Sequence, residues 1–148
     1  MSFKVTFTTK WADFDPNRHM RHSAYNDYAA EVRLRYFKKF DVTMADFAKD
    51  NVGPILFEEN TSFRREIHLG ENITANLQLT GLSENGERWK IRHQIFNEDG
   101  KLSAEINVYG AWLDLTKRKL TTPPEKFKFL FTELEKTEDF KIIEMRSK

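Results

Sequence analysis

The sequence predicts a single α+β domain in which one long helix packs against an antiparallel sheet of about five strands. Three observations predict this class: one segment with apolar residues three and four positions apart, several segments in which apolar and polar residues alternate, and tight turns between the alternating segments. The chain has 148 residues, of which 39% are hydrophobic and 14% aromatic, which suffices for one core but is short for two domains. We therefore treat residues 1–148 as one domain whose core spans about 3–120.

The long helix is predicted to begin at Ser23, whose side chain suits an N-cap, and to run for about five turns. Its apolar positions follow the helical period and are Tyr25, Tyr28, Ala29, Val32, Tyr36 and Phe40. A strand is expected before this helix at 3–9, and residues 11–22 between them show no period and are expected to form a loop. A short second helix is expected at 43–50.

Four strands are expected after the helices, because each segment alternates and turn residues separate most of them. Their ranges are 55–69, 73–79, 89–95 and 102–108, with turns at 83–86 and 99–100 and a bulge expected at Gly110. A capping-box pattern from Thr122 to Glu125 predicts a C-terminal helix at about 123–136, followed by a polar tail. One long helix can cover only one face of such a sheet, so we expect the chain to form a dimer.

Charge and composition exclude several classes of function. The chain carries 24 basic and 23 acidic residues, and this balance gives no reason to expect nucleic acid as a partner. It has no cysteine, which excludes disulfides, thiolate metal ligands and a cysteine nucleophile. No apolar run approaches the roughly 18 residues of a membrane-spanning helix, and the alternating first residues do not resemble a signal peptide. We therefore expect a cytoplasmic protein without a membrane span.

The loop before the long helix holds the densest group of functional side chains. These are Asp13, Asp15, Asn17, Arg18, His19, Arg21 and His22. A helix start offers unpaired backbone N–H groups and a partial positive charge, which suit a developing oxyanion. A carboxylate just upstream can serve as general base or nucleophile, so the arrangement points to hydrolysis or transfer at an acyl carbon.

Structural roles for the same residues stay open. Asp15 could cap a turn in the loop, and Asp13 is expected to orient the loop rather than to react. His19 and His22 with the two aspartates could bind a metal, but two histidines three apart are common and no third lies nearby, so we expect no metal and no other cofactor. The remaining histidines, His68 and His93, are expected to be structural residues on strands.

Residues 15–25, DPNRHMRHSAY, resemble the signature of hotdog-fold acyl-CoA thioesterases of the 4-hydroxybenzoyl-CoA thioesterase family. That signature begins with Asp, continues with Gly, a His or hydrophobic residue and Val, and ends with Tyr at the same spacing as Asp15 to Tyr25. Residues 63–71, FRREIHLGE, are similar to a second stretch of the family, in which an aromatic residue precedes Gly-Asp. The chain differs from the signature by Arg18 at the Gly position and by Met20 at the Val position.

The resemblance implies a hotdog fold, an antiparallel sheet wrapped around one central helix, and hydrolysis of an acyl-CoA or acyl carrier protein thioester without a cofactor. Asp15 would then be the catalytic carboxylate, the backbone N–H of His22 would polarise the thioester carbonyl, and the imidazoles of His19 and His22 would assist. Tyr25 would line the substrate pocket. A second branch of the family carries its carboxylate within the helix, where Glu31 is the nearest residue. The family also implies a homodimer or homotetramer.

Basic residues on the predicted strands are candidates to bind the phosphates of coenzyme A. The first choices are Arg64, Arg65 and Arg88, although each could equally belong to a charged solvent-facing surface. Two alternative functions remain: a non-catalytic hotdog protein that binds an acyl thioester as a sensor or carrier, and a dehydratase. The dehydratase requires a Gly-rich turn where this chain has Arg18.

Overall fold

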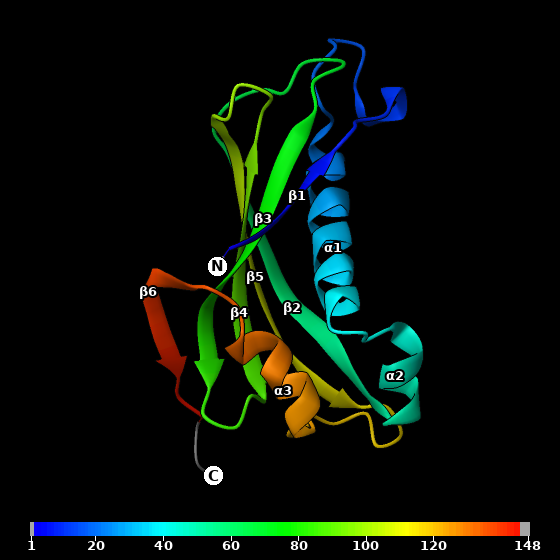
Figure 1. Cartoon of the computed structure of the whole chain (residues 1–148), viewed down its shortest axis with the longest axis vertical. Coiled ribbons are helices and arrows are strands. Elements are labelled where there is room, and N and C mark those ends of the chain that lie inside the picture. The colour runs from blue at the N-terminus through cyan, green and yellow to red at the C-terminus, as the bar shows by residue number, and fades with distance from the viewer. Residues whose placement is uncertain (1, 146–148) are drawn as a thin grey trace.

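A computed structural model describes residues 2–145 as a sheet of six strands with the long helix α1 lying along one face (Figure 1). The elements in chain order are β1 Phe3–Phe7, the 3-10 turn η1 Trp11–Asp13, α1 His22–Lys39, α2 Met44–Lys49, β2 Val52–Phe63, β3 Ile73–Ser83, β4 Arg88–Phe96, β5 Leu102–Asp114, α3 Glu125–Thr132 and β6 Lys136–Ile143. The strand order is β1-β3-β4-β5-β2, and β6 also pairs with β3. The predicted α+β class is therefore confirmed.

Helix α1 forms where the helical period predicted it and buries the predicted face. Ala24, Ala29 and Val32 have no exposed surface, so the sheet approaches the helix closely at these small residues. The predicted start is one residue late, because α1 begins at His22 with Arg21 in the N-cap position and no side-chain cap. Ser23 does not cap, because it lies within the first turn of the helix, where its hydroxyl accepts a hydrogen bond from the guanidinium of Arg21.

The two faces of the sheet differ in polarity. The face toward α1 carries buried residues such as Trp89, Ile91 and His93, whereas their neighbours Lys90 and Arg92 point to the opposite side. Helix α3 covers the part of the apolar face that α1 does not reach, where Phe131 and Phe127 stack on Trp89 and Trp112 at centroid distances of 5.1 and 5.5 Å. The outer face is polar and needs no partner to cover it. An uncovered apolar face is therefore not a reason for this chain to form a dimer.

The strand predicted at 55–69 lies instead at Val52–Phe63. Pro54 is tolerated because β2 is an edge strand, on which the missing N–H group of proline faces solvent. The bulge expected at Gly110 lies on the facing strand, between Leu56 and Glu58. Gly110 itself provides space, because a Cβ atom there would come within 2.3 Å of the Ile55 carbonyl oxygen.

The C-terminal region differs most from the expectation. Helix α3 is shorter than the predicted 123–136, and its N-cap is Pro124 without a side-chain hydrogen bond, so the capping box at Thr122 is not formed. The residues predicted to be a polar tail form β6, which pairs in parallel with the second half of β3. Strand β1 pairs with the first half of β3, so the two short strands share this edge of the sheet.

Three connections meet at the end of the sheet where α1 begins: the loop before α1, the segment between β2 and β3, and the hairpin between β4 and β5 (Figure 1). No helix within residues 2–145 combines the length and apolar character needed to cross a membrane.

Candidate active site

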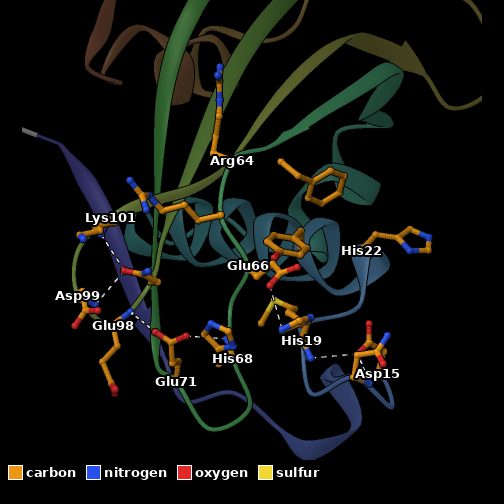
Figure 2. A pocket seen from close by; sticks show the side chains of 16 residues that line it. Asp15, His19, His22, Arg64, Glu66, His68, Glu71, Glu98, Asp99 and Lys101 are labelled. Atoms are coloured by element: carbon orange, nitrogen blue, oxygen red, sulfur yellow. Dashed lines mark hydrogen bonds and ion pairs between the residues drawn. The ribbon is translucent and has the colours of Figure 1, made fainter.

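A cavity of about 1230 Å³ lies among these three connections. The sequence predicted seven catalytic or substrate-binding residues. Six of them line this cavity, namely Asp15, His19, His22, Tyr25, Arg64 and Arg65 (Figure 2). The fold therefore brings the loop before α1 together with the segment after β2, so the two stretches that resemble the family line one cavity.

Asp15 holds the turn of the loop with one of its two carboxylate oxygens. Its Oδ1 accepts hydrogen bonds from the backbone N–H groups of Asn17 at 2.9 Å and of His19 at 3.1 Å. The backbone N–H of Asp15 donates to the carbonyl of His19 at 2.9 Å. Within residues 2–145, no hydrogen bond to Oδ2 is present. One oxygen thus fixes the position of the carboxylate, and the second is available to a substrate or a water molecule.

Arg18, at the position where the family signature has glycine, adopts a backbone conformation that glycine tolerates best. Arg18 has a φ of 65°, in the left-handed region where a side chain is unfavourable. Its carbonyl accepts a hydrogen bond from the backbone N–H of Leu69 at 2.9 Å, which ties the strained residue to the facing segment. Arg18 therefore carries backbone strain that a glycine at this position would not have.

Asp13 is a structural residue, as expected. Its side chain is 5% exposed and accepts hydrogen bonds from the Tyr28 hydroxyl and from the Lys10 backbone N–H. A guanidinium nitrogen of Arg21 lies 3.8 Å from its second oxygen. Burial, followed by the Asp13 hydrogen bond and charge, raises the pKa of the Tyr28 hydroxyl, so this phenol stays a donor. The hydrogen bond from Tyr28 to Asp13 thereby anchors the loop to α1.

The first turn of α1 faces the same cavity. The N–H groups of His22 and Ser23 belong to the first turn, where an α-helix supplies no carbonyl partner. The imidazole of His22 is exposed and points away from Glu66 and His68 (Figure 2). Tyr25, also at this end of α1, is buried, and its ring centroid lies 5.1 Å from that of Phe63. Burial and the negative charges of Glu66 and Glu71 raise the pKa of Tyr25 to about 12.

The segment after β2 contributes residues that the sequence analysis did not select. Ile67 is fully buried, and its carbonyl accepts a hydrogen bond from the Met20 N–H at 2.8 Å. Its neighbours Glu66 and His68 are exposed at the cavity, and Glu66 Oε2 lies 3.0 Å from Nε2 of His19. His68 is therefore not the structural strand residue that was expected. The alternation of residues 66–68 predicts a shared face, but not that His19 lies opposite.

Two other candidates lie outside this cavity. Arg88 donates a hydrogen bond to the Tyr109 hydroxyl at 2.8 Å and lies 5.9 Å from the ring centroid of Phe57, so it does not line the cavity with Arg64 and Arg65. Glu31 forms an ion pair with Arg35 one turn along α1, at 2.9 Å, and does not line the cavity either. The side chain of Arg64 extends away from Asp15 (Figure 2).

Comparison with known families places the chain among the thioesterases. Residues 9–131 match the model of the thioesterase-like superfamily, which covers most of the chain, and the protein belongs to that superfamily. A search of curated proteins gave no match.

Solved structures with the same fold include several thioesterases, which confirms the hotdog fold. A hypothetical protein from Staphylococcus aureus, solved in complex with CoA, is 21% identical with a TM-score of 0.83, over 93% of this chain and 87% of that one. The 1,4-dihydroxy-2-naphthoyl-CoA thioesterase from Synechocystis is 16% identical with a TM-score of 0.80, over 90% and 98%. A Thermus thermophilus thioesterase complexed with coenzyme A and Zn is 19% identical with a TM-score of 0.72, over 89% and 92%.

Proposed function

We propose that the protein hydrolyses an acyl-CoA thioester to a free acid and CoA, with Asp15 as the catalytic carboxylate. The observation that carries this proposal is that Asp15, with one uncommitted oxygen, lines the same cavity as the first turn of α1. A carbonyl held between them has an attacking oxygen on one side and N–H donors for its developing negative charge on the other. Membership of the thioesterase-like superfamily supports the reaction class.

Two routes use this geometry. As a general base, Asp15 takes a proton from water while the water oxygen attacks the carbonyl carbon; the C–S bond then breaks and the CoA thiolate takes up the proton. As a nucleophile, Asp15 attacks the carbon itself, expels the thiolate and forms an anhydride that water hydrolyses. In both routes the N–H groups of His22 and Ser23 stabilise the oxyanion. The imidazoles of His19 and His22 are candidates to move protons between water and the leaving thiolate.

Coenzyme A is the proposed acyl donor, with an acyl carrier protein as the alternative. Arg64 and Arg65 stand at the cavity with Lys101 from the β4–β5 hairpin, which provides basic groups for phosphates. Two of the structural neighbours were solved with CoA, which supports the same choice here. Arg88 is not part of this proposal.

We further propose that the working form is a homodimer or a dimer of dimers. Strand β2 is an edge strand of 12 residues, and it exposes Leu56 and Phe57. A long edge strand with exposed apolar side chains can pair with a second copy, which would extend the sheet across both subunits. Such pairing would bring the partner's residues toward the cavity.

The test is release of free thiol from a panel of acyl-CoAs that varies chain length and includes aryl groups. The Asp15→Asn variant keeps an oxygen to accept the two N–H bonds of the turn, so the loop stays folded while the charge is lost. We expect kcat to fall by ~10²–10⁴ with little change in KM.

Glu31→Gln is the matched control, because it removes a carboxylate on α1 outside the cavity and should leave turnover nearly unchanged. An inactive Glu31→Gln with a fully active Asp15→Asn would transfer the catalytic role to the helix carboxylate. No thiol release by the wild-type protein with any member of the panel would favour the alternative function, a non-catalytic binder of acyl thioesters.

A further inference from the structure

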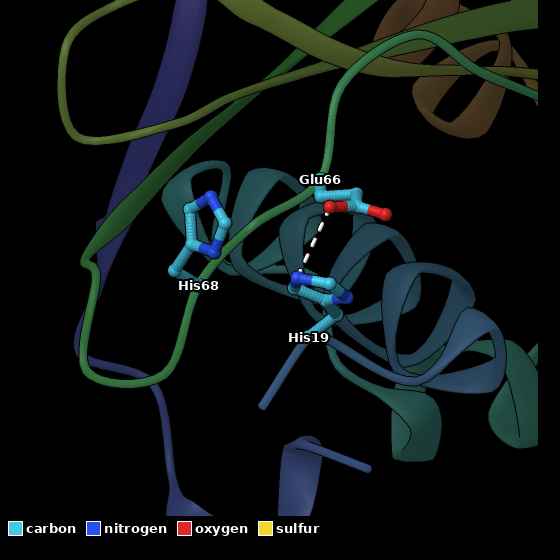
Figure 3. A group of neighbouring side chains, drawn as sticks. All are labelled: His19, Glu66 and His68. Carbon is cyan, nitrogen blue, oxygen red and sulfur yellow. Dashed lines mark ion pairs between the residues drawn. The ribbon is translucent and has the colours of Figure 1, made fainter. Parts of the chain in front are cut away.

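The cavity also contains Glu66 and His68, which have no part in the proposed hydrolysis; when a metal occupies His19 as proposed below, His22 remains the imidazole available for proton transfer. Together with His19 they offer one imidazole nitrogen or carboxylate oxygen each, and these three atoms lie within 4.8 Å of one another (Figure 3). Glu66 Oε2 is 3.0 Å from His19 Nε2, and the two imidazole rings have their centroids 5.1 Å apart.

The backbone fixes this grouping. His19 and His68 face each other as a bridged pair in two antiparallel segments, which are joined by the N–H of Met20 to the carbonyl of Ile67 and by the N–H of Leu69 to the carbonyl of Arg18. In an extended segment, residues two apart project to the same side. Glu66 and His68 therefore project together, while Ile67 between them is buried on the other side.

We propose that His19, Glu66 and His68 form a binding site for a divalent transition-metal ion, for which Zn²⁺ is the best match. Two imidazoles and one carboxylate are ligands that Zn²⁺ accepts, whereas Mg²⁺ and Ca²⁺ prefer oxygen alone. Tetrahedral Zn²⁺ with bonds of ~2.1 Å places its ligand atoms ~3.4 Å apart. Glu66 Oε2 and His19 Nε2, now 3.0 Å apart, must therefore separate slightly, and any wider pair within the 4.8 Å limit must close by at most ~1.4 Å. The Glu66 side chain is 65% exposed, so its carboxylate has room to make this adjustment while it stays beside His19.

Three protein ligands leave a fourth coordination position open to the cavity. The bound ion would link the loop before α1 to the segment after β2 and hold the two walls of the cavity together. Because the ion binds the folded chain, it should also stabilise that chain against unfolding.

This set of ligands differs from the one considered from the sequence. Asp13 is buried and bonded to Tyr28, and the His22 side chain points away from Glu66 and His68 (Figure 2). His22 is therefore a suitable control: it is an exposed histidine of the same cavity that the proposed site does not use. Glu98 is the corresponding control for the carboxylate, because it lines the cavity from the hairpin.

The experiment is isothermal titration of untagged, chelator-treated protein with Zn²⁺, and with Mg²⁺ as the counter-test. We expect saturable Zn²⁺ binding at one equivalent per chain and none for Mg²⁺. Loss of an outer-shell partner already weakens metal sites by ~10–100-fold, so His68→Ala and Glu66→Gln should weaken binding at least as much. His22→Asn and Glu98→Gln should bind Zn²⁺ as the wild type does.

Thermal melts supply the second readout, since Zn²⁺ should raise the Tm of the wild type and of both controls but not of His68→Ala. The proposal is overturned if Zn²⁺ fails to saturate, if His22→Asn loses affinity as His68→Ala does, or if both ligand variants bind normally. Neither readout uses a thioester, so the outcome is independent of whether the protein hydrolyses acyl-CoA.

Discussion

His93 is expected to make the stability of the fold strongly dependent on pH. Its ring lies on β4 in the core without exposed surface, where Nδ1 is 2.8 Å from the carbonyl oxygen of Asn76 and Nε2 is 3.0 Å from a guanidinium nitrogen of Arg33. Arginine only donates, so Nε2 accepts a hydrogen bond from Arg33, and Nδ1 carries the hydrogen and donates to the backbone carbonyl of Asn76. In this neutral form, both ring nitrogens of His93 have a hydrogen-bond partner.

A protonated ring would place two positive charges against each other in the core. Burial, and then the charge of Arg33, lower the pKa of His93 to about 3, against a smaller opposing effect of the hydrogen bond to Asn76. In the unfolded chain the pKa is 6.5. The folded value is depressed, so this contribution to stability is present above pH 6.5 and is lost as the pH falls toward 3. Linkage then predicts a loss of ~2 kcal/mol between pH 7.5 and pH 5.

The assay is urea unfolding of the wild type and of His93→Gln at pH 7.5, 6 and 5. Glutamine can accept from Arg33 and donate to Asn76, but it cannot take up a proton, so carboxylates that titrate in both proteins cancel in the comparison. We expect the wild type to be more stable at pH 7.5, and its advantage to shrink by ~2 kcal/mol at pH 5. An advantage that stays constant over this range would refute the reasoning, as would an NMR signature of a protonated His93 ring at pH 5.

Three other predictions follow from the structure. Arg18→Gly should stabilise the fold by ~0.5 kcal/mol, because relief of the left-handed strain exceeds the added entropy of the unfolded chain, and a lower Tm would contradict this. Arg64→Ala and Arg65→Ala should raise KM for acyl-CoA more than they lower kcat at low salt; an unchanged KM in both would exclude a contact with CoA phosphates. Light scattering should give a mass above the 17.6 kDa chain, and Phe57→Glu on β2 should reduce it; a wild-type monomer at micromolar concentration would remove the dimer.

The parts of the fold that the sequence predicted correctly are those fixed by local periodicity. The buried face of α1 follows from residues three and four apart, and the alternation in 89–95 places His93 in the core of β4. Strand β6 was missed because its residues are mostly polar, and its position depends on the free second half of the β3 edge, which is distant in sequence. The end of β2 was missed for a similar reason, since residues 67–69 pair with the loop before α1.

The residues of the candidate site also fall into those that a local motif predicts and those that only long-range contacts bring together. Asp15, His19 and His22 could be found because they lie within one short motif, whereas Arg88 was selected by charge alone and lies outside the cavity. The pairing of His19 with His68 is a long-range backbone contact that no local pattern encodes.

Asp13 and Asp15 are only two residues apart, yet their surroundings give them different roles. Asp13 is buried, with its oxygens committed to Tyr28, Lys10 and Arg21, so its charge holds the loop on α1. Asp15 lines the cavity and uses one oxygen for the turn, while its other oxygen accepts no hydrogen bond from residues 2–145. Both oxygens of Asp13 have partners within the fold, whereas Asp15 is oriented through one oxygen and can offer the other to a bound molecule. Asp13 thus holds the loop on α1, and the free oxygen of Asp15 is the physical reason why we propose Asp15, and not Asp13, as the catalytic carboxylate.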